Sequence, residues 1–170
     1  VDFPEYGLND HIIEMIVSSS SLHDVGKIAI PDNILLKPGR LTNEEFDCMK
    51  SHTTKGCDVL NNIEGIWEDE YRQCAYDICR HHHERFDGRG YPDGLKGDEI
   101  PVSAQLVSVA DVYDALVSER CYKKAFPKDK AAEMIINGEC GVFSPKLLIS
   151  FGKVTKEFEA LADSNKNKQV

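Results

Sequence analysis

Hydrophobic side chains recur at intervals of three and four residues in several stretches of the chain, as they do on one face of an α-helix. The clearest stretch follows Thr42, which forms a capping-box pattern with Glu45 and predicts a helix over about 43–60. The same period predicts helices over about 10–23, 71–82, 103–118, 127–136 and from Pro145 to about Leu161. The pattern therefore predicts an all-α fold.

Two segments between these helices are rich in turn-forming residues, and we expect both to be loops. They are residues 30–40 and residues 86–94, and neither is flanked by the alternating pattern of paired strands. The 170 residues fit one domain, which we expect to span 1–162. A polar tail over 163–170 is expected to be disordered.

Composition and charge narrow the possible partners. The chain is 41% hydrophobic and 29% charged, with a formal net charge of -9, which disfavours binding to a nucleic acid polymer or an anionic membrane. No apolar run approaches the ~20 residues of a membrane span, and no signal segment opens the chain, so we expect a cytoplasmic protein. The six cysteines form no CxxC pair and are expected to be buried free thiols: Cys48, Cys57, Cys74, Cys79, Cys121 and Cys140.

The candidate metal-binding or catalytic residues are histidines and aspartates at the ends or inner faces of separate predicted helices. Any one of them is more often an ordinary core residue, but His23, His52, the run His81-His82-His83 and Asp111 occur together. Burying several such groups is costly unless they are paired or bind a metal. Imidazole with carboxylate suits Fe, Mn or Zn better than Ca. Spacing leaves open whether 81 and 82 or 82 and 83 point inward.

The motifs in their order resemble the HD-GYP family of HD phosphohydrolases over about residues 8–153. They are His23-Asp24-Val25-Gly26-Lys27, Ile30-Pro31-Asp32, Lys37-Pro38-Gly39, His52 with Gly56, His82-His83-Glu84, Asp87-Gly88-Arg89-Gly90-Tyr91-Pro92, and Asp111-Val112-Tyr113-Asp114-Ala115-Leu116 with Ser118-Glu119-Arg120. The resemblance implies a helical bundle with a centre of two or three divalent metals between its helices. It also implies hydrolysis of the bacterial messenger cyclic di-GMP to pGpG, GMP or both.

The resemblance also implies roles for particular residues. The implied metal ligands are His23, Asp24, His52, His82, His83 and Asp111, with Asp24 bridging the metals. Lys27 matches the lysine that contacts the substrate phosphate, so Asp24 and Lys27 are the expected catalytic residues. Tyr91, Arg120 and Lys123 are expected to bind the dinucleotide, whereas Glu84 and Asp87 are expected to support the ligands or the loop.

One departure from the family leaves the function open. The family has a further helix before the His-Asp pair that carries another His and, in some members, a Glu, but only 22 residues precede His23 here. We expect either that this helix has been lost or that the centre is incomplete, and His11 and Glu14 lie too near the pair to replace the missing ligands. A degenerate module that binds cyclic di-GMP or a protein without turnover is therefore the alternative. A general mononucleotidase is a weaker one, and an upstream sensory or receiver domain and a homodimer are expected as possible partners.

Overall fold

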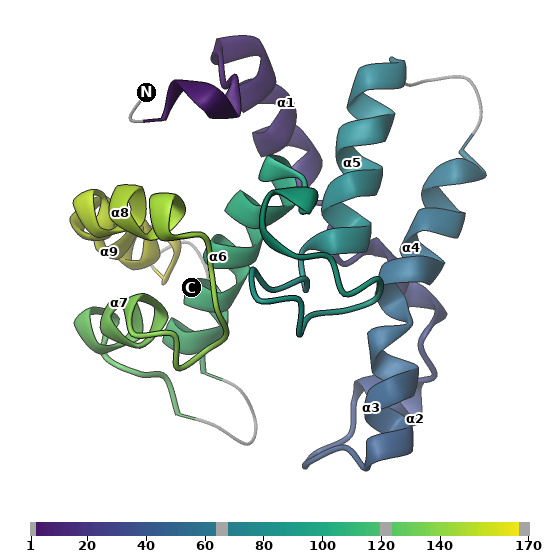
Figure 1. The fold of residues 1–170 in the computed structure, drawn as a ribbon. Coiled ribbons are helices and arrows are strands. Elements are labelled where there is room, and N and C mark those ends of the chain that lie inside the picture. The colour runs from purple at the N-terminus through teal and green to yellow at the C-terminus, as the bar shows by residue number, and fades with distance from the viewer. Residues whose placement is uncertain (1–2, 64–67, 120–123, 167–170) are drawn as a thin grey trace.

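The computed structural model describes residues 3–63, 68–119 and 124–166 and, within them, an all-α fold (Figure 1). The α-helices are α1 (Asp10–Ser20), α2 (Asp32–Leu35), α3 (Asn43–Lys50), α4 (His52–Asn61), α5 (Asp69–His81), α6 (Val102–Val117), α7 (Lys128–Ile136), α8 (Pro145–Lys153) and α9 (Thr155–Lys166). Short 3₁₀ helices are η1 (Pro4–Tyr6), η2 (Val25–Ala29) and η3 (Gly97–Glu99). These residues contain no strand, only an isolated antiparallel bridge between Asp87 and Lys96. The predicted fold class is confirmed.

Helix α6 is the centre of the molecule, with α1, α4 and α5 on one side and α7 to α9 on the other (Figure 1). On the first side, Val107 of α6 packs with Ile16 of α1 and with Ile78 of α5. On the second side a larger apolar cluster joins α6, α7 and α8. Because α6 is packed on both sides, residues along it are held firmly relative to the rest of the fold.

Two predicted helices are each divided in the structure. The helix expected over about 43–60 breaks at Ser51, between α3 and α4. Here the Ser51 hydroxyl donates to the carbonyl of Cys48, and Thr53 and Thr54 donate in the same way to Lys50 and Ser51. Such side-chain bonds compete with the helical ladder and bend or interrupt it.

The last predicted helix, to about Leu161, is likewise two helices that meet at Val154. α9 continues to Lys166, beyond the point where we expect the tail to begin, and residues 167–170 lie outside the described part. The segment expected to be a loop over 30–40 contains the short helix α2.

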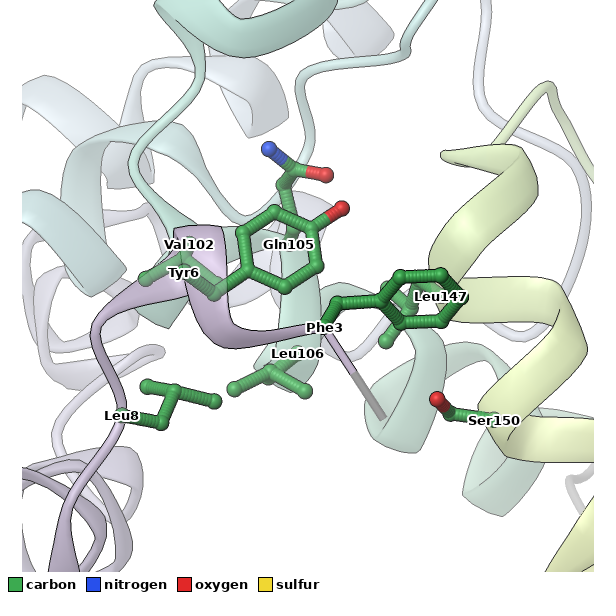
Figure 2. Close-up of a pocket in the computed structure, with 8 residues that line it drawn as sticks. All are labelled: Phe3, Tyr6, Leu8, Val102, Gln105, Leu106, Leu147 and Ser150. Atoms are coloured by element: carbon green, nitrogen blue, oxygen red, sulfur yellow. The ribbon is translucent and has the colours of Figure 1, made fainter. Parts of the chain in front are cut away.

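An apolar cavity of about 140 Å³ lies where η1 covers α6 and α8 (Figure 2). Phe3, Tyr6 and Leu8 line it from the N-terminal segment, and Leu106 and Leu147 line it from the helices. The Tyr6 hydroxyl is 2.9 Å from that of Ser144, just before α8. This contact ties the start of the chain to its C-terminal helices.

The described cysteines are all free thiols. Three of them are buried as expected: Cys57, Cys74 and Cys79. Cys48 and Cys140 are partly exposed, so the prediction that they are buried was wrong. Cys121 lies outside the described residues. None of the helices in the described ranges is long and apolar enough to span a membrane.

Candidate metal centre

The ends of three helices and the middle of a fourth bring the six predicted ligands together. His23 and Asp24 lie in the turn after α1, His52 begins α4, His82 and His83 follow α5, and Asp111 lies within α6. The imidazole rings of His52, His82 and His83 lie 4.0 to 5.5 Å apart, centroid to centroid. One potential ligand atom from each of these three lies within 4.8 Å of the others.

Two glycines let the His-Asp turn approach α4. A Cβ on Gly26 would overlap the carbonyl oxygen of His52 and the backbone of Gly56. A Cβ on Gly56 would in turn overlap the Sγ of Cys79 on α5. The absence of side chains at both positions therefore allows Asp24, His52 and α5 to meet at one place.

Backbone carbonyls hold one nitrogen of three of these imidazoles. Nδ1 of His23 lies 2.7 Å from the carbonyl of Ser20, and Nδ1 of His52 lies 2.7 Å from that of Met49. Nδ1 of His82 lies 3.0 Å from the carbonyl of Ile78. A carbonyl only accepts, so Nδ1 is the protonated nitrogen in each ring, and in the neutral form Nε2 presents its lone pair.

The Nε2 atoms of His52 and His82 lie near one carboxylate oxygen. Oδ1 of Asp24 lies 3.4 Å from Nε2 of His52 and 3.9 Å from Nε2 of His82. All three atoms are buried and have no hydrogen-bond partner among the described residues. Acceptors that face one another in the interior are costly unless a proton, a water molecule or a metal ion lies between them. The donor set, imidazole nitrogen with carboxylate oxygen, fits a divalent transition metal.

Burial keeps the inner imidazoles neutral. It lowers the pKa of His52, that of His82 to about 4 and that of His83 to about 2, and the neighbouring histidines add to the effect for the last two. Neutral imidazole is the form that binds metal. Near neutral pH, these three residues therefore need not lose a proton to become ligands.

His23 behaves differently because it lies between two carboxylates. Its Nε2 is 3.2 Å from Oδ2 of Asp24 and 3.7 Å from Oδ1 of Asp111. Burial alone would lower its pKa, but hydrogen bonds with Asp111 and Asp24 outweigh that effect and raise the pKa to about 10. Both carboxyl groups keep a lowered pKa despite burial, chiefly through the hydrogen bond with His23. Without metal, a proton on His23 thus offsets part of the negative charge of the centre.

A cleft of about 300 Å³ opens beside the centre. Asp24, Lys27, His83 and Asp111 line it, together with Arg85, which the sequence analysis did not single out. Nζ of Lys27 lies 2.5 Å from Oδ2 of Asp24. A cation therefore stands at the mouth of the centre, next to the carboxylate that faces three of the histidines.

The loop over 86–94 is attached to the centre through Tyr91 and Glu84. The ring of Tyr91 stacks on that of His83 at 4.8 Å. The buried Glu84 carboxylate accepts hydrogen bonds from the backbone N–H groups of Asp93, Gly94 and Leu95, at 2.8 to 3.1 Å. Glu84 thus supports the loop, as expected, and its oxygens are already engaged there.

Other candidates lie elsewhere. His81 turns away from the centre, with its Nδ1 3.5 Å from Asp93, so His82 and His83 are the inward pair. His11 faces Glu70 at 3.6 Å and is largely exposed, as is Glu14. Asp87 accepts from the backbone and side chain of Arg89 within the loop.

Two further residues that were predicted to bind the substrate have no described position. Arg120 and Lys123 lie outside the residues that the structure describes. Their expected contacts with a dinucleotide stay predictions.

Comparison with known proteins agrees with this architecture. A family model described as "HD domain" matches residues 6–147. The chain is 45% identical over 163 residues to a cyclic di-GMP phosphodiesterase of Vibrio cholerae, covering 94% of this chain and 33% of the relative. It is 44% identical over 153 residues to a cyclic di-GMP phosphodiesterase of Thermotoga maritima, covering 90% of this chain and 40% of the relative.

A third relative differs in its named substrate. A 3'3'-cGAMP-specific phosphodiesterase of Vibrio cholerae is 40% identical over 159 residues, covering 94% of this chain and 30% of the relative. The chain thus spans 33%, 40% and 30% of the lengths of these three relatives, respectively. The chain belongs to the HD domain family, in its HD-GYP branch.

Proposed function

We propose that this chain is the catalytic domain of a metal-dependent phosphodiesterase that hydrolyses cyclic di-GMP. The observation that carries the proposal is the group of buried, unpartnered acceptor atoms on Asp24, His52 and His82 beside an open cleft. Unpartnered acceptors in a closed core would only destabilise the fold, but beside a cleft they suit a reactive metal centre. We infer the reaction from the relatives, which are named cyclic di-GMP phosphodiesterases.

The residues proposed to hold two or three divalent ions are His23, Asp24, His52, His82, His83 and Asp111. Asp24 is the proposed bridge, because both of its oxygens face imidazole nitrogens from different elements. Fe and Mn are the ions we favour for this donor set, with Zn as a third choice. Such ions would act as Lewis acids toward a phosphoryl oxygen and lower the pKa of a bound water.

The chain's own side chains would bind and orient the substrate. Lys27, at the mouth of the centre, would stabilise negative charge on the phosphoryl oxygens. Tyr91 offers an aromatic ring beside His83, on which a base can pack. Arg120 and Lys123 keep their proposed role as further contacts to the dinucleotide.

Cyclic di-GMP is the proposed substrate, with pGpG, GMP or both as products. The relative that is specific for 3'3'-cGAMP makes this second cyclic dinucleotide the natural comparison. An upstream sensory or receiver domain and a homodimer remain proposals for the whole protein. The alternative of a module that binds without turnover has less support, because the six proposed ligands lie close together.

The test is a product assay joined to metal analysis. Protein loaded with Mn²⁺ should convert cyclic di-GMP to linear products faster than it converts 3'3'-cGAMP. A chelator should abolish turnover, and added Mn²⁺ should restore it. Metal-loaded protein that binds cyclic di-GMP but releases no product would instead establish the binding module. Faster cleavage of 3'3'-cGAMP would correct the substrate.

A further inference from the structure

Arg85 is a cation of the cleft that the proposed chemistry has not used. It follows Glu84, two residues after His83, and lines the cleft together with Lys27, Asp24 and Asp111. Its side chain is only partly exposed. Arg85 therefore places a second positive charge in the cleft beside the metal centre.

The guanidinium is held at one of its nitrogens. Nη1 donates to the Oγ of Ser108 on α6 at 2.9 Å and to the carbonyl of Glu84 at 2.9 Å. The guanidinium carbon lies 5.2 Å from the ring centre of Phe143. A Cβ on Gly141 would overlap Nε, so the side chain is also confined on that side. Such fixed placement removes much of the entropy that a flexible cation loses on binding a ligand.

Arg85 forms no ion pair in the part of the chain that the structure describes. Among the described residues no carboxylate oxygen lies within 4.0 Å of it, and Nη2 makes no hydrogen bond. Lys27 differs, because its Nζ is paired with Asp24. Burial lowers the pKa of Arg85, as expected for a cation with too little compensation. A partly buried guanidinium beside a cleft, with donors to spare, favours an anionic ligand.

We propose that Arg85 binds the phosphate of the cyclic dinucleotide that is not being cleaved. The inference rests on the proposed function, since a cyclic dinucleotide carries two phosphodiesters. Lys27 and the metal centre would take one of them. Arg85 lines the same cleft but makes no ion pair with Asp24 or Asp111, so its guanidinium is not engaged by the carboxylates that are proposed to hold the metals.

The test compares substrates with two phosphates and with one. Arg85→Met keeps a long side chain against Phe143 and removes the charge. In protein loaded with Mn²⁺, this change should raise KM for cyclic di-GMP by about 10- to 100-fold, the range for a lost charge-assisted bond of ~1.5–3 kcal/mol. Cleavage of bis(p-nitrophenyl) phosphate, which has one phosphodiester, should stay within about twofold, and metal content should not change. Calorimetry with pGpG on metal-free protein, which cannot turn it over, should also show a weaker affinity for the variant.

Arg89→Met is the matched control, because Arg89 lies in the neighbouring loop, is 84% exposed and pairs with Asp87. This control variant should leave KM for cyclic di-GMP and the cleavage of bis(p-nitrophenyl) phosphate unchanged. A second variant, Ser108→Ala, keeps the charge but frees Nη1, and it should raise KM for cyclic di-GMP with kcat and metal content preserved. This variant also tests the proposal if Arg85→Met fails to fold.

The outcomes separate the inference from the function on which it rests. Equal losses on both substrates, or no loss on either, would overturn the role of Arg85 while leaving cyclic di-GMP hydrolysis intact. Wild-type protein that cleaves bis(p-nitrophenyl) phosphate but neither binds nor cleaves cyclic di-GMP would overturn the proposed function, and the inference with it.

Discussion

Gly26 lies against the carbonyl oxygen of His52 with no room for a Cβ between them. The two residues belong to different elements, η2 and the start of α4, and Nε2 of His52 lies 3.4 Å from Oδ1 of Asp24, two residues before Gly26. The separation between these backbones therefore sets the distance from Asp24 to its facing imidazole. The size of one missing side chain controls the geometry of the centre.

Gly26→Ala should accordingly push η2 away from α4. We expect a loss of about 1–3 kcal/mol in the free energy of unfolding, the usual range for overpacking, together with a lower metal content. Gly39→Ala is the control, since a Cβ there would meet nothing within 4 Å. Denaturant titration and metal analysis check both variants. Wild-type stability and full metal content in the Gly26→Ala protein would show that the close approach of Gly26 to His52 determines neither property.

Asp24→Ala should remove the proposed bridge between the metals. We expect metal affinity to fall by more than about 100-fold, because even residues that only orient ligands contribute about 10- to 100-fold. Hydrolysis should fall with it. Asp32→Ala, at an exposed position in the first turn of α2, should retain both properties. Unchanged metal content in purified Asp24→Ala would exclude this carboxylate as a ligand.

Metal binding should release a proton from His23. Its pKa is raised to about 10 by Asp111 and Asp24 against the opposing effect of burial, so His23 is protonated at about pH 7.5 in the metal-free protein. A metal competes with that proton, and affinity should increase by up to about tenfold per pH unit between about pH 6.5 and 8.5. His82 and His83 contribute no proton in this window, because burial lowers the pKa values to about 4 and about 2.

Calorimetry of Mn²⁺ binding in two buffers with different ionisation enthalpies measures this release. His23→Asn should remove the proton release, whereas His11→Asn, at an exposed histidine beside Glu70, should preserve it. Binding of the metal without proton release in the wild-type protein would contradict the protonated state of His23.

Glu84→Gln should loosen the loop over 86–94 without removing a ligand. The amide offers one acceptor oxygen in place of two, so an N–H among Asp93, Gly94 and Leu95 loses its partner. We expect a loss of about 1–3 kcal/mol in stability and a lower kcat/KM for cyclic di-GMP, with metal content maintained. Glu99→Gln, a change to an exposed acceptor for the N–H of Lys96, is the control. Loss of metal in Glu84→Gln would place the carboxylate in the metal centre instead.

The periodic pattern was sufficient to place the main helices, because each has an apolar face that must be buried. It could not detect the break at Ser51, where hydroxyl bonds to Cys48 and neighbouring carbonyls interrupt a stripe that looks continuous. The short helices η2 and α2 were also missed. Each is five residues or fewer, too short to show a period.

The site was predictable where chemistry and motif coincide, as at His52 and Asp24, and less so where position depends on tertiary packing. Sequence left open which two of the three histidines at the end of α5 face inward, and the turn after α5 decides that. No motif or periodic pattern in the sequence indicated a role for Arg85. Its importance depends on Ser108 and Gly141, which lie more than 20 and 50 residues away and become neighbours only in the folded chain.

The attachment of the loop through Glu84 determines which loop positions can change without loss of the attachment. All three bonds that the carboxylate accepts come from main-chain N–H groups, which every residue except proline possesses. Positions 93 and 95 can therefore change to any residue except proline without losing these donors, whereas position 94 requires glycine because its φ is +69°. Because Glu84 directly follows His83, the loop is attached beside this predicted metal ligand. Substitutions at positions 93 and 95 can therefore change the surface of the loop while its attachment next to His83 is kept.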